Sequence, residues 1–116
     1  MERKIITIDG LEFEFIGSSR NTRYGFAHDC TLFINGRNAC TAHAYYLNRT
    51  WECYRYQTVF KNAVNTMIAD RIEQETQDFK RKHGYKRLTA ARRQELQAVL
   101  QDVDPLNTFR RVYEAL

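Results

Sequence analysis

Two glycine-containing dipeptides constrain how the first 47 residues can fold. Asp9-Gly10 and Asn35-Gly36 each separate two segments in which apolar and polar residues alternate. Such dipeptides suit the tight turn of a β-hairpin, because a type I′ turn needs positive φ at both of its central residues. The sequence therefore predicts two antiparallel hairpins.

The first hairpin has predicted strands at Ile5–Ile8 and Leu11–Ile16, joined by the Asp9-Gly10 turn. A two-residue turn pairs Ile8 with Leu11, and this register fixes which side chains share a face. Five apolar residues then lie on one face, and two glutamates point to water: Ile6, Ile8, Leu11, Phe13 and Phe15 on the first, Glu12 and Glu14 on the second.

The second hairpin follows a polar segment, Gly17–Arg23, that we expect to be a loop. Its strands are predicted at Tyr24–Phe33 and Arg37–Leu47. The register depends on the turn: a two-residue turn places His28 opposite His43, whereas a three-residue loop ending on Gly36 places Cys30 opposite Cys40. We prefer the second register because it gives the more apolar face, made by Phe26, Cys30, Leu32, Cys40, Ala42, Ala44 and Tyr46.

His28, Cys30, Cys40 and His43 are residue types that bind zinc. In the preferred register, however, His43 points to the opposite face and no set of four ligands closes. The alternative interpretation is that the cysteines are small apolar residues of a strand core. We predict no metal and no cofactor.

The sequence after residue 50 has helical periodicity. Thr50 is a suitable N-cap and Gly84 a suitable C′ residue, which together predict one long helix over residues 50–83. Its apolar stripe then turns by about 120°, so we expect its second half to pack on the two helices that follow or to form a dimer. The first part of the stripe is Cys53, Tyr56, Phe60, Ala63, Val64 and Met67, and the second part is Ile68, Ile72 and Phe79.

Two shorter helices are predicted over residues 89–116. Thr89 caps the first, Ala90–Asp102, with Leu96, Val99, Leu100 and Val103 facing inward. Asp104-Pro105 begins the second, with proline at its first position, and Leu106, Phe109, Val112, Tyr113 and Leu116 face inward. The expected fold is α+β: a four-stranded antiparallel sheet of two hairpins packed by one long helix, followed by two short C-terminal helices, all in one domain of residues 1–116.

Composition narrows the class of protein. A chain of 116 residues with 43% hydrophobic residues can bury one core. It has no apolar run near the ~18 residues of a membrane span and no signal-peptide pattern at its start. Its three cysteines fit a reducing compartment. We therefore expect a soluble cytoplasmic protein, monomeric or homodimeric.

Positive charge is concentrated in the last third of the chain. Residues 1–79 carry nine Lys or Arg and ten Asp or Glu, whereas residues 80–116 carry nine and four. A basic run can contact phosphates, and a tyrosine can stack on a base. The alternative is a solvated helix end whose cations complement the helix dipole. The candidate nucleic-acid-binding residues are Arg20, Arg23, Lys80, Arg81, Lys82, Tyr85, Lys86, Arg87, Arg92 and Arg93.

A second candidate surface lies where the strand pattern gives way to the helix pattern. Trp51, Tyr54 and Arg55, with Arg49 nearby, project away from the stripe that faces the sheet, and such residues are enriched in binding hot spots. The alternative is that Trp51 folds back as peripheral core. Because the sequence has no Gly-rich phosphate loop and no evident nucleophile beside Asp29 and His43, we predict a protein that is not an enzyme.

Residues Asn21–His28 and Tyr45–Thr58 resemble a pattern in small accessory proteins of phages and plasmids of Gram-positive bacteria. The likeness covers about the middle third of the chain. Such proteins include anti-CRISPR and other anti-defence proteins, so the resemblance implies an inhibitor of a host nuclease or nucleoprotein complex. Many such inhibitors are acidic mimics of nucleic acid, whereas this chain is basic. We therefore expect contact with nucleic acid or with an acidic protein surface.

Overall fold

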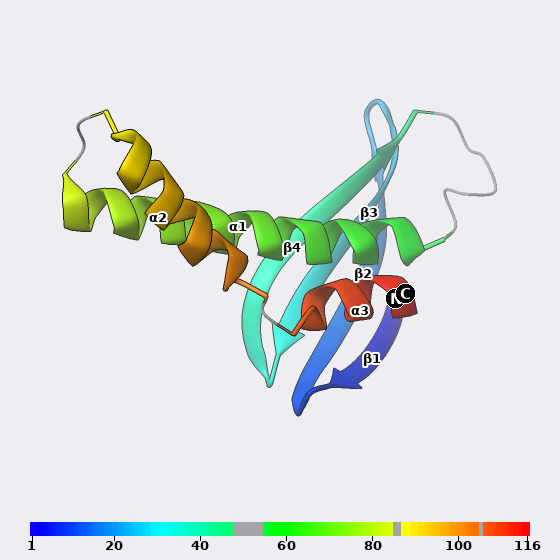
Figure 1. Cartoon of the computed structure of the whole chain (residues 1–116). Coiled ribbons are helices and arrows are strands. Elements are labelled where there is room, and N and C mark those ends of the chain that lie inside the picture. Colours follow the sequence, from blue (N-terminus) through cyan, green and yellow to red (C-terminus); the bar gives the residue numbers. More distant parts are fainter. Residues whose placement is uncertain (48–54, 85–86, 105) are drawn as a thin grey trace.

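The computed structural model describes residues 1–47, 55–84, 87–104 and 106–116. Four strands form an antiparallel sheet in the order β1-β2-β3-β4. Helices α1 and α3 pack on one face of the sheet, whereas α2 lies along the distal half of α1, beyond the sheet (Figure 1). The predicted α+β fold is confirmed. The elements are β1 (Glu2–Ile8), β2 (Leu11–Thr22), β3 (Gly25–Ile34), β4 (Arg37–Tyr46), α1 (Gln57–His83), α2 (Ala90–Gln101) and α3 (Thr108–Ala115).

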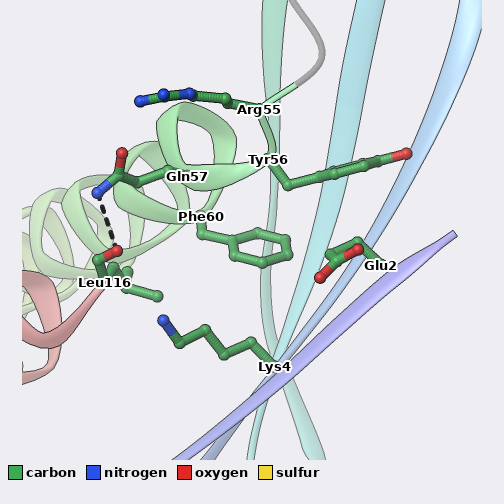
Figure 2. A pocket seen from close by; sticks show the side chains of 7 residues that line it. All are labelled: Glu2, Lys4, Arg55, Tyr56, Gln57, Phe60 and Leu116. Atoms are coloured by element: carbon green, nitrogen blue, oxygen red, sulfur yellow. Dashed lines mark hydrogen bonds between the residues drawn. The ribbon is translucent and has the colours of Figure 1, made fainter. Parts of the chain in front are cut away.

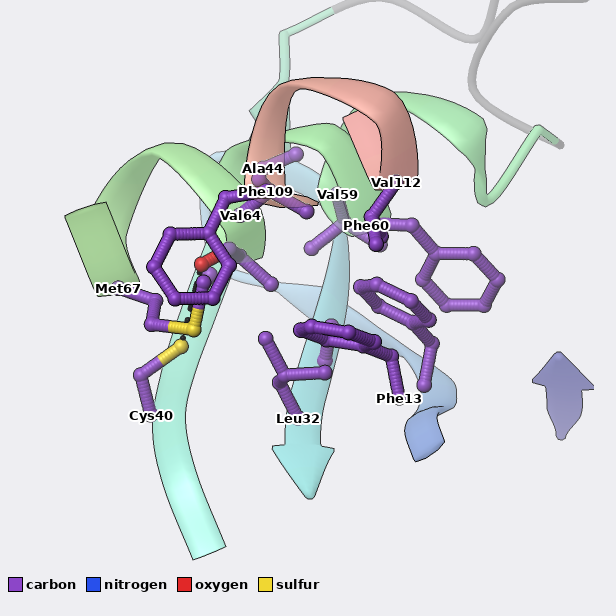
Figure 3. Close-up of a cluster of buried hydrophobic side chains, with 14 residues drawn as sticks. Phe13, Leu32, Cys40, Ala44, Val59, Phe60, Val64, Met67, Phe109 and Val112 are labelled. Carbon is purple, nitrogen blue, oxygen red and sulfur yellow. Dashed lines mark hydrogen bonds between the residues drawn. The ribbon is translucent and has the colours of Figure 1, made fainter. Parts of the chain in front are cut away.

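The hydrophobic core lies between the sheet and the helices α1 and α3 (Figure 3). Phe13 contacts Phe109 of α3 edge to face, with ring centres 6.0 Å apart, and Phe15 contacts Phe60 of α1 at 5.4 Å. Aromatic contacts of this kind add to the free energy of burying the rings. The buried side chains include Phe13, Phe15, Cys30, Leu32, Cys40, Ala42, Ala44, Val59, Phe60, Ala63, Val64, Met67, Phe109 and Val112.

The first hairpin has the predicted turn and register. Asp9 and Gly10 have φ of 54° and 75°, and Ile8 pairs with Leu11. Turn chemistry and the alternating pattern both specify this register, which explains why the prediction is confirmed.

The predicted loop at Gly17–Arg23 is wrong: β2 continues to Thr22 and pairs with β3 from Phe13 to Thr22. The polar side chains of Ser18 and Arg20 lie on the open face of the sheet. These residues are polar because this face of the strand is exposed to solvent, and not because the segment is a loop. Packing explains the glycine at position 17, because a Cβ there would come within 2.5 Å of the Tyr56 ring.

The preferred register of the second hairpin is wrong by two residues, because Cys30 pairs with Ala42 and not with Cys40. Asn35 and Gly36 form a two-residue turn with φ of 50° and 78°, and a bulge follows at Leu32/Phe33. The bulge places one extra residue in β4, so His28 pairs with Ala44. The alternative register, in which His28 pairs with His43, is therefore wrong as well. A shift of two residues leaves side chains on the same face, so the predicted apolar face is correct.

Both the long helix and the last helix begin later than predicted. Helix α1 begins at Gln57, after Tyr56, whose ring packs against His28 of β3. The expected N-cap Thr50 and the predicted core residue Cys53 lie outside the described residues. Helix α3 begins at Thr108, because Asn107 has a left-handed φ of 54°. The carboxylate of Asp104 still accepts a hydrogen bond from the backbone N–H of Phe109 at 3.2 Å.

The second half of α1 lies beside α2, but Ile68, predicted to belong to the turned stripe, packs against the core of the sheet. Phe79 is buried, but Ile72 is 39% exposed, and no residue of α2 is fully buried. In the last segment Leu106 is 66% exposed, so its predicted inward position is wrong. Among the described residues, none of the helices combines the length and the apolar character that crossing a membrane requires.

Candidate functional site

The β2–β3 hairpin and the end of β4 meet at one end of the sheet (Figure 1). Thr22 pairs with Gly25 across the hairpin turn, and Phe26 and Ala27 pair with Tyr46 and Tyr45 of β4. The pairing of β3 with β4 brings together residues that are eighteen and twenty positions apart in the sequence.

Three large side chains at this end are exposed to solvent. Tyr24, Tyr45 and Leu47 are 76%, 64% and 82% exposed. Two arginines lie against the tyrosines: the guanidinium of Arg20 is 5.7 Å from the ring centre of Tyr45, and that of Arg23 is 5.7 Å from the ring centre of Tyr24. We call these five residues the tip surface.

A polar network on the open face of the sheet fixes Arg20 in place. Its Nε donates to Asp29 Oδ2 at 2.8 Å, and its Nη2 donates to the Tyr45 hydroxyl at 3.4 Å. Asp29 Oδ1 lies 2.6 Å from Nδ1 of His43. The hydrogen bond from Arg20 holds the pKa of Asp29 below its usual value; partial burial opposes this effect and His43 adds to it. The network therefore pre-orients Arg20 and Tyr45.

An aromatic cluster on the opposite face supports the same end of the sheet. The buried ring of His28 contacts Tyr56 at 4.3 Å and Phe26 at 5.0 Å between ring centres. Ser19 Oγ lies 3.3 Å from His28 Nδ1 and also contacts the Tyr56 hydroxyl. The strands beneath the tip surface are thus packed, which favours a rigid surface.

The predicted partner-binding residues are only partly described. Arg55 is exposed, but it is not part of the tip surface. It lines a groove of about 390 Å³ between β1, the start of α1 and Leu116. Figure 2 shows Arg55 and Tyr56 pointing in opposite directions from the start of α1. Arg49, Trp51 and Tyr54 lie outside the described residues.

The structure does not bring the predicted nucleic-acid-binding residues together. Arg20 and Arg23 belong to the tip surface, whereas the residues of Lys80–Arg93 that are described lie where α1 ends and α2 begins, at the opposite end of the molecule (Figure 1). Tyr85 and Lys86 are outside the described residues. We call Lys80, Arg81, Lys82, Arg87, Arg92 and Arg93 the basic corner.

The basic corner is less positive than its sequence suggests. Arg81 lies 3.5 Å from Asp78, and Arg92 lies 2.7 Å from Glu95. Glu75, Asp78 and Glu95 line a groove between α1 and α2 together with Lys82. Arg87 and Arg93 are exposed.

Within the described residues, no three His, Cys, Asp or Glu side chains are arranged to hold a metal ion. Asp29 and His43 share the open face of the sheet, and their neighbours in the polar network are Arg20 and Tyr45.

Sequence reasoning missed Tyr24, Tyr45 and Leu47 as site residues. The two tyrosines occupy a turn and the outer face of a strand, and only the pairing of β3 with β4 brings them to one end. A tyrosine in a hairpin turn beside an arginine was the one local signal that could have indicated an exposed aromatic residue.

Comparison with known proteins does not assign a family: no family model, no curated protein and no solved structure matches the chain.

Proposed function

We propose that this chain is a non-enzymatic binding protein that docks on its target through the tip surface. The observation that carries the proposal is the exposure of Tyr24, Tyr45 and Leu47 at one end of the sheet, beside Arg20 and Arg23. Tyrosine and arginine dominate binding hot spots because they bury large areas and still make directed polar contacts. Stacking orders both arginines in advance, which lowers the entropy lost on binding.

The resemblance to phage accessory proteins favours one class of target. We propose that the chain inhibits a host nuclease or nucleoprotein complex by occupying an acidic protein surface on it. The charges at the tip support this choice: Asp29 is engaged by Arg20 and His43, which leaves Arg23 as an exposed positive charge beside Tyr24. Complementary charge would then set both the orientation and the rate of docking.

The test compares two double variants as immobilised baits. Tyr24→Ser with Leu47→Ser removes the exposed apolar area of the tip, whereas Ile5→Ser with Leu106→Ser removes exposed apolar residues elsewhere, 46% and 66% exposed. We expect a host nuclease complex to be captured by wild type and by the second variant but not by the first. Purified wild type should also inhibit the nuclease activity of that complex. Equal capture by both variants, at equal thermal stability, would contradict the proposal.

A second candidate function is binding of nucleic acid through the basic corner. One observation favours it: Arg92 and Arg93 lie in the first turn of α2, which contains no acidic residue. Positive charge at a helix N-terminus is unfavourable for the helix. The ion pair with Glu95 offsets this cost for Arg92, so it is Arg93 that helix stability does not explain. Phosphate binding would explain Arg93.

Salt dependence distinguishes this second function. Fluorescence anisotropy with a labelled single-stranded DNA or RNA oligonucleotide should show binding at low salt that weakens steeply as salt rises. Arg87→Gln with Arg93→Gln should reduce the slope of log K against log salt by about two, whereas Arg110→Gln, on α3, should leave it unchanged. Absence of binding at about 50 mM salt would exclude this function.

A further inference from the structure

The two edge strands of the sheet are protected to different degrees. β1 carries Glu2, Arg3 and Lys4, α3 packs against it, and Lys4 Nζ reaches the backbone carbonyl of Ala115 at 3.5 Å. β4 has no Lys, Arg, Asp, Glu or Pro between Asn38 and Tyr46. Charged residues and proline are the usual means of keeping a free edge from pairing with another strand. From Asn38 to Tyr46 the edge of β4 lacks them.

The direction of the backbone of β4 shows which groups face this edge. Asn62 of α1 donates to the carbonyl of His43 at 3.3 Å, so this carbonyl faces the helix side of the edge and not β3. Backbone groups of a strand alternate in direction, so the N–H and C=O of Thr41 and Tyr45 face the same way. Among the described residues, no further strand pairs with β4.

Helix α1 provides a flank above this edge. It crosses β4 and continues past the border of the sheet (Figure 1). One side of α1 carries four polar residues at helical spacing: Asn62, Thr66, Asp70 and Glu73. The hydrogen bond from Asn62 to His43 identifies this side as the one above the edge of β4. The thiol of Cys40 donates to the backbone carbonyl of Ala63 at 3.2 Å, which ties this part of α1 to β4. Burial, and to a smaller extent the charge of Asp70, raise the pKa of Cys40 to about 11, in keeping with this placement.

This geometry indicates what a strand added to β4 would meet. Its backbone would pair with Thr41, Tyr45 and the N–H of His43, because the carbonyl of His43 already accepts a hydrogen bond from Asn62. The side chains on its helix side would face the side of α1 that carries Asp70 and Glu73. The neighbouring cation, Arg71, is directed elsewhere, since its guanidinium lies 4.8 Å from the ring centre of Phe109. The flank above the added strand is therefore acidic.

We propose that the free edge of β4 binds an extended, basic segment of a partner protein as a fifth strand. Main-chain hydrogen bonds would supply affinity, and lysine or arginine at alternate positions under α1 would supply specificity. A second copy of this chain fits the edge less well, because pairing of two β4 strands would bring Asp70 and Glu73 of both copies together. This surface is separate from most of the tip surface, although Tyr45 belongs to both.

The first experiment uses two synthetic peptides of about ten residues, the length of a strand. Both have threonine at every second position, with lysine in one and glutamate in the other at the remaining positions. We expect the lysine peptide to shift the amide NMR signals of Thr41, His43 and Tyr45, and to bind at least about tenfold more tightly than the glutamate peptide. Equal binding of both peptides, or shifts confined to other residues, would overturn the proposal.

Variants of this chain separate the two parts of the proposal. Asp70→Asn with Glu73→Gln should reduce the preference for the lysine peptide about fivefold, whereas Glu12→Gln, an exposed carboxylate on the open face, should not change it. Thr41→Lys, with Thr41→Pro as a second variant, should block the edge, whereas Thr7→Lys on β1 should retain binding. Retention of binding by both Thr41 variants would exclude the edge.

Two further outcomes define the relation to other functions. The Tyr24→Ser with Leu47→Ser variant should still bind the lysine peptide, so loss of tip docking and loss of strand addition can be told apart. A dimer in analytical ultracentrifugation that Thr41→Lys dissociates would overturn the proposal in favour of a second copy.

Discussion

Gly25 lies so close to Tyr46 that a Cβ at residue 25 would come within 2.2 Å of the backbone carbonyl oxygen of Tyr46. Gly25 also has a φ of 148°, which side chains rarely allow. Both facts concern the point at which the β2–β3 hairpin contacts the end of β4, so this glycine determines how closely the two parts of the tip surface approach.

We therefore expect Gly25→Ala to lower the free energy of unfolding by about 2–4 kcal/mol, because it combines backbone strain with a steric clash. Gly36→Ala is a matched control, since Gly36 has a φ of 78° but nothing within 4 Å of its Cβ position. It should cost only about 1 kcal/mol. Urea denaturation measures both values, and equal costs would show that the contact with Tyr46 is not tight.

The carboxylate of Asp29 should make stability depend on pH in the acidic range. Its pKa is lower in the folded chain than in the unfolded chain, chiefly because Arg20 donates a hydrogen bond to it. A group of this kind stabilises the fold above its unfolded pKa of about 3.9, and the contribution is lost as the pH falls through the folded value.

Asp29→Asn should therefore cost about 1 kcal/mol near neutral pH and nothing at the lowest pH at which the chain stays folded. Glu12→Gln, on the same face, is the control. Free energies of unfolding measured by urea at several pH values test this expectation. A constant difference between wild type and Asp29→Asn at all pH values would show that the ion pair does not contribute.

Local sequence patterns determine some features of this fold and leave others open. The Asp9-Gly10 hairpin was predicted correctly because its turn and its alternation agree. The register of the second hairpin was not, because the bulge near Phe33 leaves no mark in the pattern. A shift of two residues preserves the face, so the core was predicted correctly even where the pairing was wrong.

The candidate site was harder to predict than the core. Polar residues of β2, such as Ser18 and Arg20, have the composition of a loop, and only their pairing with β3 makes them a strand. The tip surface also depends on the pairing of β3 with β4, since that pairing brings Tyr24 and Tyr45 to the same end of the sheet. Contacts of this kind depend on tertiary structure, which is absent from any local window of the sequence.

The buried cysteines should be unreactive in the folded protein. Burial raises the pKa of Cys30 to about 12 and that of Cys40 to about 11, and the thiolate is the form that reacts with alkylating reagents. At about pH 8, iodoacetamide should therefore modify both only after unfolding in concentrated guanidinium chloride. Mass spectrometry of the peptides measures this difference. Rapid modification of Cys40 in the folded protein would mean that α1 opens from β4.

Docking of α3 on the sheet should depend on Phe109. Its ring is 3% exposed and contacts Phe13, whereas Leu106, three residues earlier, is 66% exposed. Phe109→Ala should lower the free energy of unfolding by about 3–5 kcal/mol, because it leaves a cavity between α3 and the sheet. Leu106→Ala should change it by less than about 0.5 kcal/mol. Thermal and urea unfolding measure both; a small effect of Phe109→Ala would show that α3 contributes little to the core, and that β1 is less covered than its contacts with α3 indicate.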